Sequence, residues 1–200
     1  MRRPGVNRRQ LKRTISRGLG SKFKKDITRQ VKASVERAKN LMLAEFESHV
    51  VTKEIEGGPS ASNLSGTLGG VGNLFSFIGF DSSDRPIAPV RRVLMASTRL
   101  QSVTKLTGDQ LAFEITITVP SKEDLRMASP LPWAAARSWV IGIEQGLSGL
   151  GSFLVKPGGG RSGAAIQVTG VMRSGGFKNT KYISLILSHL HSNLLKFIKS

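Results

Sequence analysis

A long run of apolar residues spaced three or four positions apart is the feature that most limits how this chain can fold. The run begins at Phe23 and continues through Ile27, Val31, Val35, Ala38, Met42 and Phe46. Because an α-helix turns once every 3.6 residues, this spacing places the whole run on one helical face. The sequence therefore predicts a helix from Ser21 to about His49. At 1.5 Å per residue that helix is roughly 42 Å long, which exceeds the width of a small sheet. We therefore expect its N-terminal end to overhang the body of the protein, with its apolar face either packed on its own sheet or partly packed between subunits.

The residues before and around the start of this helix are strongly basic. The first forty residues hold fourteen Lys or Arg and two acids, a net charge of +12 out of +17 for the whole chain. Residues 1–20 contain Pro4, Gly5, Gly18 and Gly20, and we interpret them as a flexible arm. Such a concentration of positive charge favours a polyanion as partner, with backbone contacts and no base-specific reading. The alternative is a tail that only keeps the protein in solution. The residues predicted to contact the polyanion are Arg2, Arg3, Arg8, Arg9, Lys12, Arg13, Arg17, Lys22, Lys24 and Lys25.

The middle of the chain carries a period of two that is typical of β-strands. The alternation is clearest over residues 111–119, with 100–106 as the expected hairpin partner across the turn at 107–110. Weaker patterns predict strands at 139–143, 152–156 and 165–171, a glycine-rich hairpin tip at 158–163, a short strand or plug at 74–80, and a helix or strand start at 90–98.

A terminal helix is predicted from Thr180 to Lys199, capped by Asn179 or Thr180. The expected fold class is α+β: a flexible basic N-terminal arm, a long N-terminal helix, a mixed and mostly antiparallel sheet, and a C-terminal helix. We expect residues 1–20 to form the arm and residues 21–200 to form a single domain.

Catalytic signatures are absent from the sequence. There is no cysteine and there are three histidines, of which His189 and His191 would point away from each other on a helix. The glycine-rich stretches match no nucleotide-binding motif. The adjacent acids Glu123 and Asp124 fit a solvated turn better than paired-acid catalysis. A nucleic-acid enzyme would need a carboxylate cluster for Mg²⁺, and the thirteen acids form none that we recognise. We expect no enzymatic activity, no cofactor, no bound metal, no secretory signal and no membrane-spanning helix.

Three short motifs occur in an order that resembles a known family. They are Leu64-Ser65-Gly66-Thr67-Leu68, the segment from Trp139 through Glu144 to Gly146, and Gly176-Phe177-Lys178. Together with the order of helices and strands, they resemble the neck or tail-completion (head–tail joining) proteins of tailed bacteriophages, of the lambda-type minor tail protein Z kind. The resemblance covers roughly residues 21–200. The apolar segment 74–80 and the long loop 57–73 depart from the family pattern.

The resemblance implies a non-enzymatic virion protein, made in the bacterial cytoplasm, that forms a homo-oligomeric ring where the tail meets the head connector. A hexamer is favoured and a dodecamer is possible. The implied partners are portal or adaptor proteins, tail terminator or tube proteins, and phage DNA in the channel, with no membrane and no small-molecule substrate. Loops 57–73 or 156–163 would reach an adjacent subunit. The alternative is a non-specific nucleic-acid-binding protein that acts through the basic arm. The residues expected at the subunit interface are Leu64, Leu68, Phe75, Phe77, Trp139, Glu144, Phe153, Phe177, Leu190 and Leu194.

Overall fold

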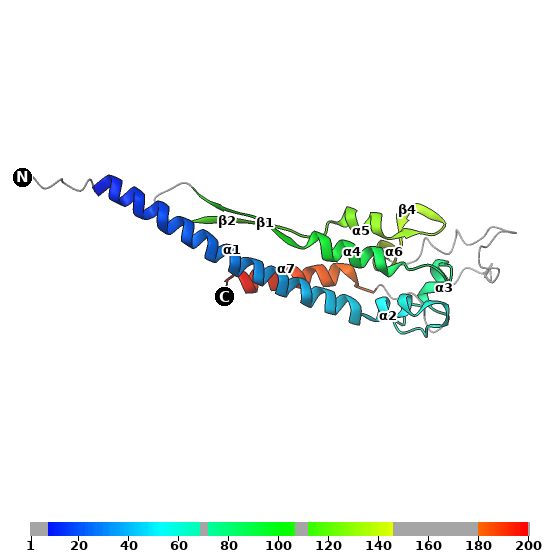
Figure 1. The fold of residues 1–200 in the computed structure, drawn as a ribbon. Helices are drawn as coiled ribbons and strands as arrows, with labels where there is room; N and C mark the ends of the chain where they lie inside the picture. Colours follow the sequence, from blue (N-terminus) through cyan, green and yellow to red (C-terminus); the bar gives the residue numbers. More distant parts are fainter. Residues whose placement is uncertain (1–7, 69–71, 107–111, 146–179, 200) are drawn as a thin grey trace, which may run out of the picture.

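The computed structural model describes residues 8–68, 72–106, 112–145 and 180–199, with side chains described from residue 20 onward. Over these residues the chain has an α+β fold, elongated along its first helix (Figure 1). A compact body lies at one end, and the N-terminal half of the first helix projects from it beside a β-hairpin. The elements in chain order are α1 (Arg8–Ser48), α2 (Val50–Glu56), the 3-10 turn η1 (Gly58–Ser60), α3 (Leu74–Ile78), α4 (Ile87–Ser97), β1 (Arg99–Lys105), β2 (Phe113–Thr118), α5 (Lys122–Ala128), β3 (Pro130–Leu131), β4 (Ala134–Ser138), α6 (Trp139–Gln145) and α7 (Ile183–Lys199).

Helix α1 begins at Arg8, more than three turns before the predicted start at Ser21. The expectation of a flexible arm over residues 1–20 is therefore wrong from Arg8 onward, while residues 1–7 lie outside the described part of the chain. The physical reason is an apolar row that the first interpretation missed: Leu11, Ile15 and Leu19 precede Phe23 at steps of four. Gly18 and Gly20 each cost about 1 kcal/mol relative to alanine in a helix, and the helix continues through both. At 41 residues it is about 60 Å long.

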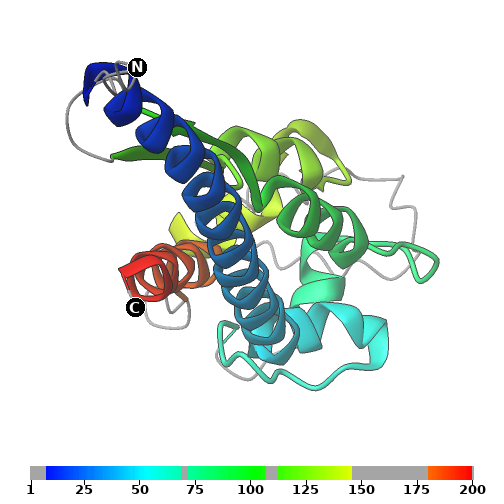
Figure 2. The same cartoon turned by 60° about the vertical axis from the view of Figure 1, so that its left-hand side comes forward.

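Helix α7 packs antiparallel along the C-terminal half of α1. Ser34 Oγ donates to the carbonyl oxygen of Phe197 over 3.1 Å, and near the other end Glu45 Oε1 lies 2.7 Å from His189 Nδ1. Figure 2 shows α7 and α4 on opposite sides of α1. Because α7 ends beside Ser34, the first 24 residues or so of α1 extend past it by roughly 35 Å, which confirms the predicted overhang of the basic end.

The hairpin β1–β2 is confirmed close to its predicted bounds and is antiparallel. Leu100 pairs with Ile117 and Val103 with Ile115, although Leu100 and Val103 are an odd number of residues apart. A bulge between Leu100 and Ser102 resolves this, because one extra residue brings both side chains to the same face of the ribbon. That face turns toward α1, and Val103 is buried there.

Two segments of the body differ from a predicted strand, and a third takes the helical form of its two predicted alternatives. Residues 74–80 hold helix α3 instead of a strand, with Asn73 as its N-cap and Gly79 as its C-cap at a φ of 87°. Residues 139–145 are helix α6, because Trp139, Val140 and Ile143 are the buried positions, which is a helical and not an alternating pattern. For segment 90–98 the helix alternative is confirmed, since residues 90–97 belong to helix α4 and Thr98 is its C-cap.

The expected single mixed sheet is replaced, among the described residues, by two separate two-stranded antiparallel sheets, β1–β2 and β3–β4. The predicted strands 152–156 and 165–171 and the hairpin tip 158–163 lie outside the described residues. The core is one apolar cluster that joins α1 and α7 to the helices of the body.

Candidate nucleic-acid interface

The projecting part of the molecule consists of residues 8–31 of α1 and the hairpin β1–β2, which we call the basic stalk. Strand β1 packs along α1, and its end reaches Gly20. A Cβ atom at Gly20 would lie 3.0 Å from Lys105 Nζ, so the end of the Lys105 side chain lies against the helix at this glycine. Beyond Gly20, twelve further residues of α1 continue outward, about 18 Å of helix.

The positive charge of the outer part of the stalk, residues 8–25 of α1, is not balanced by any acid within that segment. Residues 8–25 contain eight Lys or Arg and no acid. The acids of α1 lie further along, and each has a partner: Asp26 pairs with Arg29, Glu36 with Lys39, Glu45 with His189 and Glu47 with Arg91. Each carboxylate of α1 is therefore engaged by a base three residues further along the helix or by a residue of the body.

The described lysines of the stalk are placed to meet an external anion. Lys22, Lys24 and Lys25 are exposed on α1. On the hairpin, Arg99 and Lys105 are also exposed. Among the described residues of the hairpin, Glu114 is the one acidic residue. A surface of this kind attracts polyanions through many weak contacts, each of which releases condensed counterions.

Eight of the ten predicted contact residues are distributed along one element, α1. Arg8, Arg9, Lys12, Arg13 and Arg17 lie on the described helical backbone of α1, and the three lysines lie exposed one to two turns further along. Arg2 and Arg3 lie outside the described residues. The structure brings the described members together on a helix and not on the extended arm that the sequence suggested.

Most of the described residues among those predicted at a subunit interface are buried within the single chain. Leu68, Phe75, Trp139, Leu190 and Leu194 have 5% exposure or less. Phe77 is half-buried and packs on the core. Leu64 is 50% exposed and keeps surface for a neighbour. Phe153 and Phe177 lie outside the described residues.

Glu144, the remaining member of that set, caps α7. Its Oε1 atom accepts hydrogen bonds from the backbone N–H groups of Tyr182 (3.1 Å) and Ser184 (2.6 Å). Helix α7 accordingly begins at Ile183, and the predicted cap at Thr180 is replaced by this carboxylate, which comes from another element. Asn179 lies outside the described residues. Thr180 Oγ1 instead lies 3.2 Å from Thr67 Oγ1.

Trp139, the first residue of the second motif behind the family resemblance, packs near Tyr182. The tyrosine ring lies near those of Trp139 and Phe46, and its hydroxyl lies 2.6 Å from Thr52 Oγ1. Burial raises the pKa of this phenol well above its ordinary value. Sequence reasoning missed Tyr182 as a centre of packing, because a lone tyrosine before a helix carries no periodic signal.

A second missed residue, Glu54, joins the first motif to α3. It is fully buried, with its Oε2 accepting from the N–H of Ser65 and its Oε1 from the N–H of Leu74, both over 2.7 Å. One carboxylate therefore holds both ends of the segment 65–74. Asn73 adds to this by donating to the carbonyl oxygens of Pro59 and Ala61.

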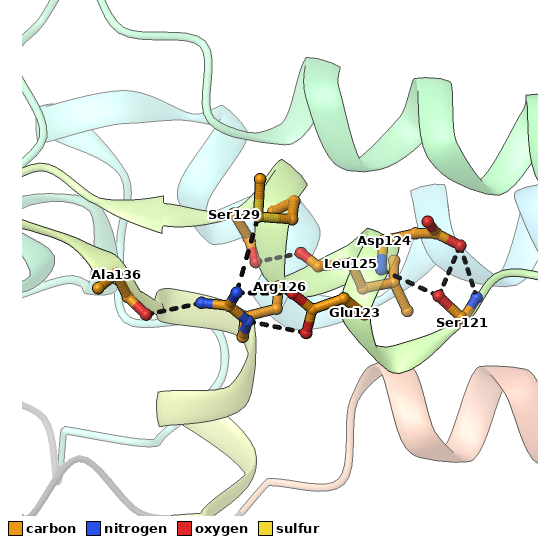
Figure 3. A network of polar contacts seen from close by, with 8 residues as sticks. Ser121, Glu123, Asp124, Leu125, Arg126, Ser129 and Ala136 are labelled. Atoms are coloured by element: carbon orange, nitrogen blue, oxygen red, sulfur yellow. Dashed lines mark hydrogen bonds and ion pairs between the residues drawn. The ribbon is translucent and has the colours of Figure 1, made fainter.

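The adjacent acids Glu123 and Asp124 are structural, although they lie in the first turn of α5 and not in a loop (Figure 3). Asp124 forms a capping box with Ser121, whose hydrogen bonds lower the pKa of that carboxyl. Glu123 receives two hydrogen bonds from Arg126, which lower its pKa. Both carboxylates are engaged in stabilising α5.

A shallow depression lies between α2 and the start of α4, lined in part by Glu56, Arg85 and Arg91. Arg91 donates to Glu47 Oε2 over 2.7 Å and to Glu56 Oε1 over 2.8 Å, and the first contact lowers the pKa of Glu47. The guanidinium is thus already occupied by two carboxylates, and the depression offers little charge to a ligand.

Two further observations concern the described residues alone. No group of three or more His, Cys, Asp or Glu side chains comes together there in a way that could hold a metal ion. No helix among them is both long and apolar enough to cross a membrane. Comparisons with family models, with curated proteins and with solved structures find no match to this chain.

Proposed function

We propose that this protein is a non-enzymatic structural subunit that binds the phosphate backbone of DNA through its basic stalk. The observation that carries the proposal is the separation of charge along α1. Eight basic side chains and no acid occupy residues 8–25, where the helix has left the body, while the acids of α1 are paired further along. A cationic element held away from the neutralising carboxylates keeps its full charge for an external polyanion.

The form of the stalk suits backbone binding better than base reading. The described part of the stalk surface presents lysine and arginine side chains, which contact phosphates without regard to sequence. We therefore propose non-specific binding to duplex DNA, dominated by counterion release.

The proposed setting is the one that the sequence resemblance implies: a ring at the junction of the head and tail of a bacteriophage, with DNA passing through its channel. Several stalks pointing toward one channel would multiply the charge that each contributes. Leu64, half-exposed beside the segment that Glu54 holds, is the interface residue for which the exposure supports a role between subunits.

The charge of the stalk is tested by measuring DNA affinity as a function of salt. Replacing Lys22, Lys24 and Lys25 by Gln should lower the magnitude of the slope of log K against log [salt] by between about 2 and 3, since each phosphate contact contributes about 0.9. A control with the same loss of charge replaces three exposed lysines outside the stalk: Lys53, Lys122 and Lys181. If the control changed the slope as much as the stalk variant, the stalk would not be the DNA-binding surface.

The ring is tested separately by mass photometry at about 0.1 and 1 M salt, with and without duplex DNA. A discrete species near six or twelve times the chain's 21.6 kDa that persists at high salt would support a packed ring. A monomer that changes mass only with DNA at low salt would favour the alternative, a free nucleic-acid-binding protein.

A further inference from the structure

The end of the β1–β2 hairpin places a lysine side chain directly on the basic part of α1. A Cβ atom added at Gly20 would lie 3.0 Å from Lys105 Nζ, 3.5 Å from its Cδ and 3.6 Å from its Cε. Gly20 is buried, whereas the five residues that follow it are all exposed. The side chain of Lys105 therefore lies over the helix backbone at this glycine, with its ammonium group at the helix surface.

The register of the hairpin fixes the position of this lysine. Val103 and Ile115 are paired on the face that turns toward α1, and Val103 is buried there. Side chains alternate along a strand, so Lys105, two residues after Val103, belongs to the same face. Glu114 is paired with Thr104 and belongs to the opposite face. The hairpin thus brings its lysine to the helix and holds its described acid away from it.

The helix positions around this ammonium group are positively charged. Position 17, one turn before Gly20, carries Arg, and position 24, one turn after it, carries the exposed Lys24. Residues three or four apart on a helix have Cβ atoms about 5–6 Å apart, so Lys24 lies beside the place where Lys105 ends. Among the described residues no carboxylate forms an ion pair with either lysine.

Two unfavourable features therefore coincide at one place. Glycine in a helix interior is less favourable than alanine, and like charges in neighbouring positions are destabilising. Features that break local rules in this way are expected at functional sites. Glycine leaves room at the helix backbone, and lysines from two separate elements converge beside it. A phosphate group suits such a place, because its oxygen atoms accept charge-assisted hydrogen bonds from more than one donor.

We propose that Lys24 and Lys105 hold one phosphate group between them at Gly20, which makes helix and hairpin a single phosphate-binding site, called here the Gly20 site. This inference rests on the proposed function, because it takes the phosphate to belong to the backbone of DNA. It adds a residue outside α1 to the DNA contact. It also places a DNA strand across the line where hairpin and helix meet, so the hairpin binds DNA and does not only support the helix.

A double-mutant cycle tests whether the two lysines share a ligand. The affinity of the full-length protein for duplex DNA is measured at fixed salt for Lys24→Gln, for Lys105→Gln and for the double variant. We expect each single substitution to lower the affinity about tenfold, the loss of one charge-assisted hydrogen bond. The double variant should lose about thirtyfold and not a hundredfold, because a phosphate that has lost one lysine is already held poorly by the other.

Lys22 provides the matched control, since it has the same charge and is exposed on the same helix. It follows Gly20 by two residues and so lies on nearly the opposite side of the helix axis. Lys22→Gln combined with Lys105→Gln should give the product of the two single effects. Lys105→Arg, which keeps the charge, should retain most of the affinity. Urea midpoints measured without DNA should not fall in any of these variants, because the substituted side chains are exposed.

Three results would overturn the inference. Losses for Lys24 and Lys105 that multiply to within about twofold would mean that the two lysines bind different phosphates. Equal coupling of Lys105 with Lys22 would mean that only general electrostatics connects these residues. Unchanged affinity in Lys105→Gln would mean that the hairpin does not contact DNA.

The inference and the proposed function fail in different ways. Salt-dependent DNA binding that is insensitive to Lys105→Gln would refute the inference and leave the proposed function standing. A second arm uses inorganic pyrophosphate at constant ionic strength in place of DNA. No DNA binding, together with a rise in melting temperature with pyrophosphate that Lys105→Gln abolishes, would support the Gly20 site and refute DNA as the source of its phosphate. No response to either ligand would refute both.

Discussion

Two glutamates each accept two backbone N–H groups, and the structure predicts that they respond differently to the same substitution. At Glu54 the two N–H groups bind different oxygens, Oε2 for Ser65 and Oε1 for Leu74. At Glu144 both N–H groups bind the single oxygen Oε1. Glutamine has one carbonyl oxygen, so it can reproduce the arrangement at position 144 and cannot reproduce the one at position 54.

The cost of Glu54→Gln follows from that mismatch. The new oxygen can accept from one of the two N–H groups, and the NH₂ group then faces the other donor. An unsatisfied buried N–H costs about 1–3 kcal/mol, and replacing a charged acceptor by a neutral one weakens the bond that remains. We expect a loss of about 2–3 kcal/mol for Glu54→Gln. For Glu144→Gln we expect about 0.5–1 kcal/mol, mainly from the lost interaction with the N-terminal end of α7.

Urea unfolding of the wild type and both variants measures these differences as shifts of midpoint at constant slope. Native-state hydrogen exchange gives a local reading, since the amides of Ser65 and Leu74 should lose protection in Glu54→Gln. The matched control is Glu56→Gln, on the same helix but half-exposed at the side chain, for which less than about 1 kcal/mol is expected. Equal destabilisation at positions 54 and 144 would refute the reasoning.

Two further predictions concern the ends of short helices. His49 Nδ1 accepts from the N–H of Val51 at the start of α2, and burial lowers the pKa of this imidazole. Neutral His49 therefore contributes to the stability of the folded protein at pH values above about 6.5, the pKa of histidine in the unfolded chain. This contribution is lost as the pH falls from there through the lower pKa of the folded state. Urea midpoints between about pH 7 and 5 should fall less for His49→Asn, which keeps a capping oxygen at every pH, and equal pH dependence would contradict this. Gly79→Ala should cost about 1–2 kcal/mol of stability by urea unfolding, because its φ of 87° disfavours a side chain. A Cβ atom at this position would lie 3.6 Å from Trp133, an ordinary van der Waals distance, so the expected cost comes from the backbone conformation and not from a clash. An unchanged urea midpoint would contradict the prediction and show that the backbone of the turn adjusts without cost.

The fold could be predicted where the pattern was both long and regular. The apolar run from Phe23 to Phe46 predicted α1 from Ser21 onward. The alternation in β2 predicted the hairpin, although the bulge near Gln101 was not visible in the sequence. Short apolar segments were ambiguous because five to seven residues fit either period. In segment 139–143 the residues at 139, 141 and 143 form an alternating pattern in the sequence. In the structure Val140 is buried together with Trp139 and Ile143, which is the pattern of a helix.

The charge of the sequence predicted where the candidate site lies, but it did not predict the secondary structure of that segment. The concentration of Lys and Arg predicted a polyanion surface, whereas glycine and proline content led to the expectation of a flexible arm. The apolar residues from Leu11 to Phe23, spaced four apart, were the signal that the helix extended further, and Gly18 and Gly20 among them favoured the interpretation as an arm. Glu54 and Tyr182 could not have been found, because their roles depend on partners far along the chain.

The positions of the acids explain how one helix can belong to two parts of the molecule. Glu45 and Glu47 connect α1 to α7 and α4 through His189 and Arg91, so negative charge stabilises the helix where it is part of the body. A carboxylate within residues 8–25 of α1 would form ion pairs with bases three or four positions away, as Asp26 does with Arg29. Each such pair would remove one positive charge from the surface offered to a polyanion. Residues 8–25 therefore lack the stabilisation that such pairs provide. A helix without these pairs is expected if binding to a polyanion stabilises it, as in the DNA contact that we propose.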